Sequence, residues 1–402
     1  MEYMESKMSN TTNLDFSNTE IAFGHKSDQE LKDTYRIFKM MNSPNLVKLG
    51  SAMTLLMSKL KLPLLDPIIK ATVFKQFCGG TNLLDCQSTI DKLYKNKTMS
   101  ILDFGVEAKD TEKDFDYTLA EILKAIQFGA ANASVPVISL KISSIARNGL
   151  LEKWQGHKPL EPFEEDELAK VKKRLHRIMH MASDMGIGVF VDAEETWVQE
   201  AMDALAEELM ETYNKKKVVA YNTFQMYRKD RLDYLKYSFE RSQNKNYYLG
   251  AKIVRGAYMV KERQRAEDQG IASPIQDNKE ATDLAFDQAI GFCVKHYNRI
   301  SSCNASHNAA SCLLQARLIS ELSIPRNHSH LNFCQLMGMS DNITFNLAQQ
   351  GYNVAKYVVY GSIAEVIPFL IRRAHENTSI TGDVGRELGL ITEEMARRRL
   401  IK

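Results

Sequence analysis

The sequence predicts an α/β protein with a (β/α)8 barrel of the TIM type, preceded by an N-terminal helical segment. After residue 98, short runs of β-branched and apolar residues alternate with longer amphipathic stretches, which is typical of parallel βαβ units. The 402 residues suffice for one barrel of about 250 residues and an accessory segment. The eight expected strands span 100–106, 135–142, 188–192, 218–224, 248–255, 301–305, 331–336 and 354–360.

Helices are expected between these strands because apolar residues recur there at three- or four-residue spacing. The clearest of them span 163–185, 195–215, 228–244, 282–297 and 308–322. A doubly wound sheet is the alternative topology, since alternation alone does not show that a sheet closes. No G-x-G-x-x-G follows the first strand and no P-loop is present, so the usual nucleotide-binding fingerprints are absent.

The segment before the barrel also has a helical pattern. Ser27 and Glu30 form a capping box, and apolar residues follow at helical spacing up to Met41. A second helix is expected over 46–60. The organisation expected along the chain is a disordered lead at 1–20, a helical extension at 21–97, the barrel at 98–390 and a C-terminal tail at 391–402.

Composition excludes several classes of protein. With 52 basic and 50 acidic residues, the net charge of +2 is too balanced for a chain whose main partner is nucleic acid. The 6 cysteines form no C-x-x-C pair, which indicates reduced thiols in a cytosolic compartment. The first 20 residues have no apolar core and no arginine, so neither a signal peptide nor a transit peptide is expected. No apolar run is long enough to span a bilayer.

Polar residues stand where most of the expected strands end. In a barrel the chemistry lies at the carboxyl ends of the strands, so these positions are candidates for a site. They are Lys141, Asp192, Gln225, Lys252, Arg255, Ser306, His307, Asn308, Gln335, Tyr357 and Tyr360. Singly, each has a structural alternative: Lys141 would suit an exposed strand, and the run that begins at Asp192 would suit a helix cap. Their joint placement at one rim favours a functional site.

A short helix after the last strand carries Arg372, Arg373 and Glu376. Residues three and four apart share a helix face, so this set offers two guanidiniums for a carboxylate and one carboxylate for an ammonium. That is a clamp for an amino acid, although a solvated salt bridge is the simpler alternative. Lys252 and Arg255, beside Gly256, could meet the phosphates or the electron-rich ring of a cofactor. The histidines lack the spacing of metal ligands, and no metal site is expected.

Five motifs together resemble the proline dehydrogenases, especially the monofunctional kind with a helical N-terminal extension. The resemblance covers roughly residues 20–390. The motifs are V-D-A-E-E-T-W at 191–197, K-I-V-R-G-A-Y at 252–258, S-H-N-A at 306–309, Q-L-M-G-M at 335–339, and Y-V-V-Y-G with P-F-L-I-R-R-A-H-E-N at 357–377.

The resemblance implies an FAD-containing barrel that oxidises L-proline to Δ1-pyrroline-5-carboxylate, with the last helix over the barrel mouth. It implies that Arg372 and Arg373 hold the proline carboxylate and that Glu376 faces the amine. Lys141 matches the lysine that pairs with these groups. The implied pocket residues are Asp192, Tyr258 and Tyr357, the last being the aromatic wall beside the ring. The implied FAD contacts are Gln225, Lys252, Arg255, Gly256, Ala257, Ser306, His307, Asn308 and Gln335, with Lys252 nearest the flavin N5 edge.

Three positions depart from the family pattern. Lys252 stands where bifunctional bacterial relatives have arginine, Phe369 stands where many relatives have tyrosine, and Val359 stands where monofunctional relatives often have proline. None of the three belongs to the charged clamp.

The resemblance also implies partners. Electrons would pass to a membrane quinone. The product would pass to a separate pyrroline-5-carboxylate dehydrogenase, because we expect no room in the 402 residues for the aldehyde dehydrogenase domain of the bifunctional relatives. The stretch 46–65 is amphipathic and could contact a membrane surface, although packing on the barrel is the favoured interpretation. We therefore expect a cytoplasmic protein with the option of peripheral attachment to a bacterial inner membrane.

Three other functions stay open. A Schiff-base lyase would use Lys141 or Lys252 as nucleophile and would be colourless. A non-catalytic sensor would bind proline or flavin without turnover. A hydroxyproline dehydrogenase would differ at position 357, because a ring hydroxyl would crowd the Tyr357 phenol.

Overall fold

The structure, a computed structural model, describes residues 14–43, 69–379 and 383–401, with the side chains at 374–384 outside the description. The chain divides into two compact units. Unit 1 comprises Glu107–Cys334, and unit 2 comprises Asn13–Val106 together with Gln335–Lys402.

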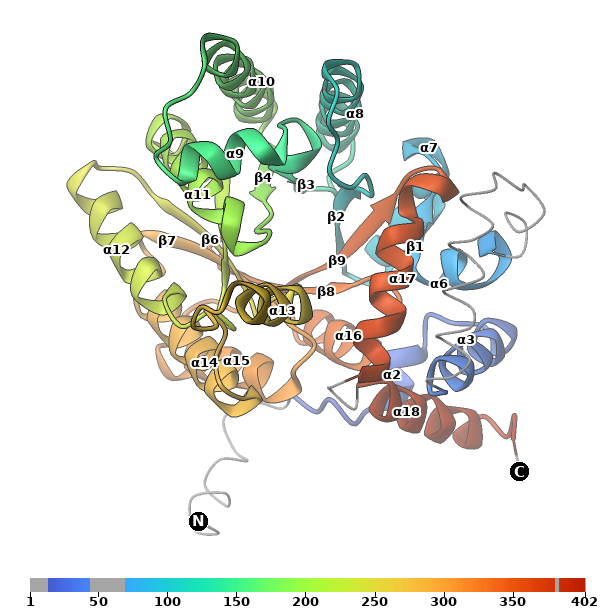
Figure 1. Ribbon diagram of the computed structural model, residues 1–402. Coiled ribbons are helices and arrows are strands. Elements are labelled where there is room, and N and C mark those ends of the chain that lie inside the picture. Colours follow the sequence, from blue (N-terminus) through green and yellow to red (C-terminus); the bar gives the residue numbers. More distant parts are fainter. Residues whose placement is uncertain (1–13, 44–68, 380–382, 402) are drawn as a thin grey trace. The chain divides into compact units, whose positions relative to one another are not determined.

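Unit 1 contains six parallel strands paired in the order of the sequence. They are β3 (Val137–Leu140), β4 (Gly188–Val191), β5 (Ala220–Gln225), β6 (Leu249–Val254), β7 (Ile300–Ala305) and β8 (Leu331–Leu336), whose last two residues fall in unit 2. The helices of this unit are α8 (Glu112–Ala130), α9 (Asn148–Gln155), α10 (Pro162–Met185), α11 (Thr196–Tyr213), α12 (Arg231–Asn244), α13 (Met259–Gln269), α14 (Lys279–Lys295) and α15 (Ala309–Glu321). Figure 1 shows this alternation, with α14 and α15 side by side.

Local sequence explains where these elements begin and end. Helix α10 starts at Pro162, after a capping box formed by Glu161 and Glu164, and it ends at Gly186, whose φ of 76° is left-handed. The β4 run G-V-F-V is buried at all four positions, as expected for a parallel strand covered on both faces.

In its described residues, unit 2 has three parallel strands. β9 (Asn353–Tyr360) pairs with β1 (Cys78–Gly80) and with β2 (Met99–Phe104). The helices of the unit are α2 (Thr19–Phe23), α3 (Asp28–Met41), the π-helix η2 (Lys70–Phe74), α6 (Lys75–Phe77), α7 (Leu83–Lys95), α16 (Asp341–Gln349), α17 (Ile363–Ser379) and α18 (Asp383–Arg397). The predicted capping box of α3 is confirmed, since Ser27 Oγ accepts from the Glu30 N–H at 3.2 Å and Glu30 Oε2 accepts from the Ser27 N–H at 2.7 Å.

The predicted fold class is confirmed. All eight predicted strands are present as β2–β9, each within a few residues of its expected bounds. A doubly wound sheet reverses its strand order at a switch point, whereas the strands of unit 1 follow one another without reversal. The chain is therefore a (β/α)8 protein of the TIM type.

Two expectations about the flanking segments differ from the structure. The extension expected to be helical contains the short strand β1, where a Cβ at Gly79 would meet Val358 Cγ1 at 2.3 Å, so only glycine fits beside β9. The expected tail at 391–402 is helical up to Arg397, because Ile391 and Met395 are buried one turn apart in α18. Of the expected disordered lead, residues 14–20 are described and α2 begins at Thr19, whereas residues 1–13 and the expected helix at 46–60 lie outside the description. None of the described helices is long and apolar enough to cross a bilayer.

Helix α18 is joined to the start of α16 by a buried cluster of charges. Lys356 Nζ of β9 lies 2.9 Å from Asp341 Oδ1, and the two side chains are only 1% and 7% exposed. Glu387 of α18 accepts from the Ser340 N–H at 2.8 Å. Burial, aided by the neighbouring Asp341 charge, raises the pKa of Glu387 to about 7.

This raised pKa predicts a pH-dependent stability. Folding favours the protonated Glu387, so the free energy of unfolding should fall as the pH rises from the ordinary pKa of 4.5 to about 7 and then level off. The substitution Glu387→Gln keeps an oxygen for Ser340 and removes the titration. We expect the Tm of this variant to fall less than that of the wild type between about pH 5 and about pH 7.5 in calorimetry. An identical fall in both proteins would contradict the assignment.

Candidate functional site

Lys141 and Asp192 follow two neighbouring strands, β3 and β4. Lys141 is half-buried and caps the 3-10 turn Ile142–Ser144 directly after β3. The Asp192 N–H donates to the Leu140 carbonyl at 2.8 Å, so the chain past β4 stays in register with β3. Both residues lie at the carboxyl ends of their strands, as the sequence predicted.

Asp192, which directly follows β4, is paired with Lys252 of β6. Lys252 Nζ of β6 lies 2.6 Å from Asp192 Oδ1, and the side chains are 8% and 15% exposed. The same ammonium lies 5.4 Å from the centre of the Phe190 ring. A buried ammonium without a partner would be costly, so the ion pair lets both charges remain inside the unit. Two residues that are 60 positions apart in the sequence thus form one polar group.

Glu194, which the sequence reasoning did not single out, is buried beside Asp192 in the same loop. Its Oε1 accepts from the Ser143 N–H at 3.2 Å. Burial, with the neighbouring Glu195 charge, raises the pKa of Glu194 to about 7, although the Ser143 hydrogen bond and the Lys141 charge act in the opposite direction. The loop is also held by Gln225 at the end of β5, whose Nε2 donates to the Glu194 carbonyl at 2.7 Å. The signal in the sequence was the run of three acidic residues in D-A-E-E, of which only Asp192 was assigned to the site.

The segment after β6 continues the same rim. Gly256 has a φ of 137°, and a Cβ there would meet the Tyr227 ring at 2.4 Å, so glycine is required. Ala257 is exposed and Tyr258 is half-buried. Arg255 donates from Nη1 to Ser306 Oγ at 2.7 Å, which joins the end of β6 to the end of β7.

The end of β7 leads directly into α15. Asn308 caps this helix, because its Oδ1 accepts from the Ser311 N–H at 3.2 Å. The Asn308 N–H itself donates to Ser306 Oγ at 3.0 Å, and His307 between them is half-buried. The first amides of a helix favour an anion, and α15 begins beside the Arg255 guanidinium.

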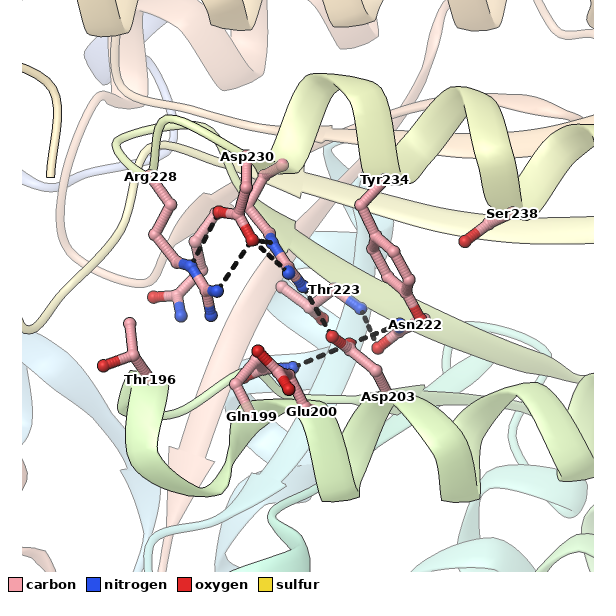
Figure 2. Close-up of polar contacts among 12 residues, drawn as sticks. Thr196, Gln199, Glu200, Asp203, Asn222, Thr223, Arg228, Asp230, Tyr234 and Ser238 are labelled. Atoms are coloured by element: carbon pink, nitrogen blue, oxygen red, sulfur yellow. Dashed lines mark hydrogen bonds and ion pairs between the residues drawn. The ribbon is translucent and has the colours of Figure 1, made fainter. Parts of the chain in front are cut away.

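Asp203 of α11 is hydrogen-bonded to Asn222 of β5, within a polar network that was not predicted from the sequence. Its carboxylate accepts from Gln199 Nε2 and Asn222 Nδ2, both at 2.9 Å, and pairs with Arg231 Nη1 at 2.5 Å (Figure 2). Asp230 accepts from Arg228 Nε at 3.0 Å in the same figure. An aspartate within the apolar residues Ala201 to Leu205 of a helix was the available signal.

The remaining candidates belong to unit 2 and are described within it. Gln335, at the end of β8, is 1% exposed and accepts from Thr344 Oγ1 of α16 at 2.9 Å. Tyr357 of β9 is 7% exposed, and its carbonyl accepts from the Met337 N–H at 3.0 Å. Tyr360, at the end of β9, is 1% exposed.

Two of the three clamp candidates can be placed. Arg372 and Arg373 are half-buried residues of α17, and the Arg373 guanidinium lies 5.6 Å from the Phe369 ring centre. Phe369 thus supplies an aromatic face for a cation. The Glu376 side chain lies outside the described residues.

Comparisons with known proteins agree on one family. Residues 86–386 match the family described as Proline dehydrogenase. The chain is 31% identical to "Proline dehydrogenase 1, mitochondrial" of Dictyostelium discoideum, over 97% of this chain and 76% of that protein. It is 29% identical to "Hydroxyproline dehydrogenase" of Xenopus laevis, over 94% of this chain and 88% of that protein.

A solved structure has the same fold. The proline utilization A protein of Bdellovibrio bacteriovorus, crystallised after inactivation by N-propargylglycine, matches 94% of this chain with a TM-score of 0.70 and 20% identity. The chain spans 41% of the length of that protein. The family match covers residues 86–386, a relative aligns over almost the whole chain, and a solved structure shares the barrel. This chain is therefore a member of the proline dehydrogenase family of oxidoreductases.

Proposed function

We propose that the protein oxidises L-proline to Δ1-pyrroline-5-carboxylate with FAD as its cofactor. The observation that carries this proposal is the convergence of polar side chains at the carboxyl ends of β4, β6 and β7, in a chain of the proline dehydrogenase family. The Lys252–Asp192 ion pair and the Arg255–Ser306 hydrogen bond involve residues that the motif resemblance assigns to substrate and cofactor.

The residues of unit 1 are suited to an anionic dinucleotide. Arg255 and the amino end of α15 offer N–H donors for phosphate oxygens, and Gly256 allows the backbone turn with positive φ directly after Arg255. Ser306, His307, Asn308, Ala257 and Gln225 are the further residues of this unit assigned to the cofactor. When bound, FAD would accept the hydride equivalent from the carbon beside the proline amine.

The substrate roles are assigned to the charged residues. In unit 2, Arg372 and Arg373 are assigned to the substrate carboxylate, Glu376 to the amine and Tyr357 to the ring. In unit 1, Lys141, Asp192 and Tyr258 are assigned to the substrate. The protein then contributes orientation and electrostatics rather than a covalent intermediate.

The electrons are proposed to leave to a quinone, and the product to a separate pyrroline-5-carboxylate dehydrogenase. The amphipathic stretch 46–65, proposed for contact with a membrane or with the barrel, lies outside the described residues. A soluble quinone analogue is sufficient as the acceptor in the tests below.

The clamp predicts a kinetic effect for Arg373→Met. Hydrogen bonds to charged groups contribute about 1.5–3 kcal/mol, so kcat/KM for L-proline should fall by about one to two orders of magnitude, with FAD content and Tm nearly unchanged. Arg36→Met is a matched control, because Arg36 is an exposed arginine of the same unit that pairs with Asp33 on the same helix. Steady-state kinetics of the flavin-replete variant at wild-type kcat/KM would refute the clamp.

Substrate choice provides a second test, which separates proline from hydroxyproline oxidation. The Tyr357 phenol should crowd a ring hydroxyl, so kcat/KM should be higher for L-proline than for trans-4-hydroxy-L-proline. Tyr357→Ser should narrow this gap mainly by weakening the use of proline, whereas Tyr94→Ser, at a half-exposed position of α7, should leave it unchanged. Equal kcat/KM values for both substrates in the wild type would show that the Tyr357 phenol does not exclude a ring hydroxyl.

A further inference from the structure

The guanidinium of Arg255 is held in place by side chains from two helices and the end of β7. Its Nε donates to Asp283 Oδ1 of α14 at 2.6 Å, and its Nη2 donates to Ser311 Oγ of α15 at 2.9 Å. The Nη1 donates to Ser306 Oγ, and the Phe286 ring centre lies 4.2 Å from the guanidinium carbon. The charge is therefore fixed on several sides within unit 1.

The geometry leaves part of the guanidinium fork available. Arginine has five N–H donors, one on Nε and two on each terminal nitrogen. Three of them are used by Asp283, Ser306 and Ser311, so one hydrogen on Nη1 and one on Nη2 have no partner in the described part of the chain. Two donors on adjacent nitrogens suit bidentate binding of phosphate or carboxylate oxygens.

The groups that hold Arg255 are themselves fixed. Asp283 also accepts from Lys279 Nζ at 2.5 Å, and Ser311 Oγ donates to Asp287 Oδ1 at 2.6 Å. Asp283 and Asp287 are one turn apart on α14, so they lie on the same face of that helix. Although burial alone would raise it, the hydrogen bonds from Lys279 and Arg255 hold the pKa of Asp283 below its ordinary value, so the carboxylate is ionised at neutral pH.

We propose that Asp283 and Ser311 are positioning residues, which orient Arg255 so that its two remaining N–H groups bind the phosphate oxygens of the dinucleotide cofactor. The proposal rests on the proposed function, because it concerns the cofactor assigned there. A long arginine side chain loses rotamer freedom when it binds an anion, and a side chain already fixed in the free protein avoids that loss. Cofactor affinity, rather than the chemical step, should therefore depend on Asp283 and Ser311.

The test measures the release of FAD from the purified holoenzyme by the rise in flavin fluorescence on dilution. Asp283→Ala should weaken FAD binding about tenfold, and Ser311→Ala should weaken it about threefold or more, because each removes an acceptor from a charged donor. Asp283→Asn should restore binding to within about threefold of the wild type, since its amide oxygen still accepts from Arg255 Nε. Lys279→Met is the matched control: it removes the other partner of Asp283 without touching Arg255, and FAD release should be unchanged.

A double-mutant cycle with Arg255→Ala separates positioning from a general structural role. If Asp283 acts through Arg255, adding Asp283→Ala to Arg255→Ala should cause no further loss of FAD affinity. Independent, additive losses would overturn the proposal, as would wild-type FAD release in both Asp283→Ala and Ser311→Ala. If Asp283→Ala does not fold, as judged by its Tm, Ser311→Ala in the same cycle decides. A wild-type protein that never binds FAD would refute the proposed function itself, which distinguishes that failure from a failure of the positioning role.

Discussion

The strands of unit 1 all run in the same direction, and the placement of every candidate residue in that unit depends on this. In a parallel arrangement the residue after each strand lies at the same edge, so Lys141, Asp192 and Arg255 share a rim although they are far apart in the sequence. The pairs Lys252–Asp192 and Arg255–Ser306 are direct consequences, since each joins the ends of different strands. The proposed chemistry requires that this rim carry polar and charged side chains for the cofactor and the substrate.

Burying the charged side chains of this rim costs free energy of desolvation, and ion pairs between the side chains offset that cost. A charge removed from water is tolerated only when a partner replaces the lost hydration. Lys252 has Asp192, Arg231 has Asp203 and Arg255 has Asp283, and the carboxylate of each pair comes from a different element than the cation. These pairs therefore fix the relative position of neighbouring elements as well as neutralising charge. Pairing leaves the Arg255 fork partly available, which is the property that a cofactor site needs.

The sequence alone predicted the fold class, the eight strands and the rim residues, because alternation of strand and helix patterns is strong in this chain. It missed β1, whose C-G-G has no strand periodicity and is required by the close approach of β9. It also missed Asp203 and Asp283, because a single acidic residue in a helix has the same local pattern whether it faces solvent or an arginine. It missed Glu194 because the run D-A-E-E does not show which of its carboxylates is buried. Only the tertiary contacts distinguish these cases. The expected tail is part of α18, because Ile391 and Met395 are buried one turn apart among many charged residues.

The central claim is that the protein is a flavoenzyme that takes electrons from L-proline. The most direct measurement is the visible absorption spectrum of the purified protein, before and after anaerobic addition of L-proline. Our account predicts flavin bands that bleach on addition of L-proline and persist on addition of glycine. A protein without flavin bands after incubation with FAD, or flavin bands that L-proline leaves unchanged, would contradict it.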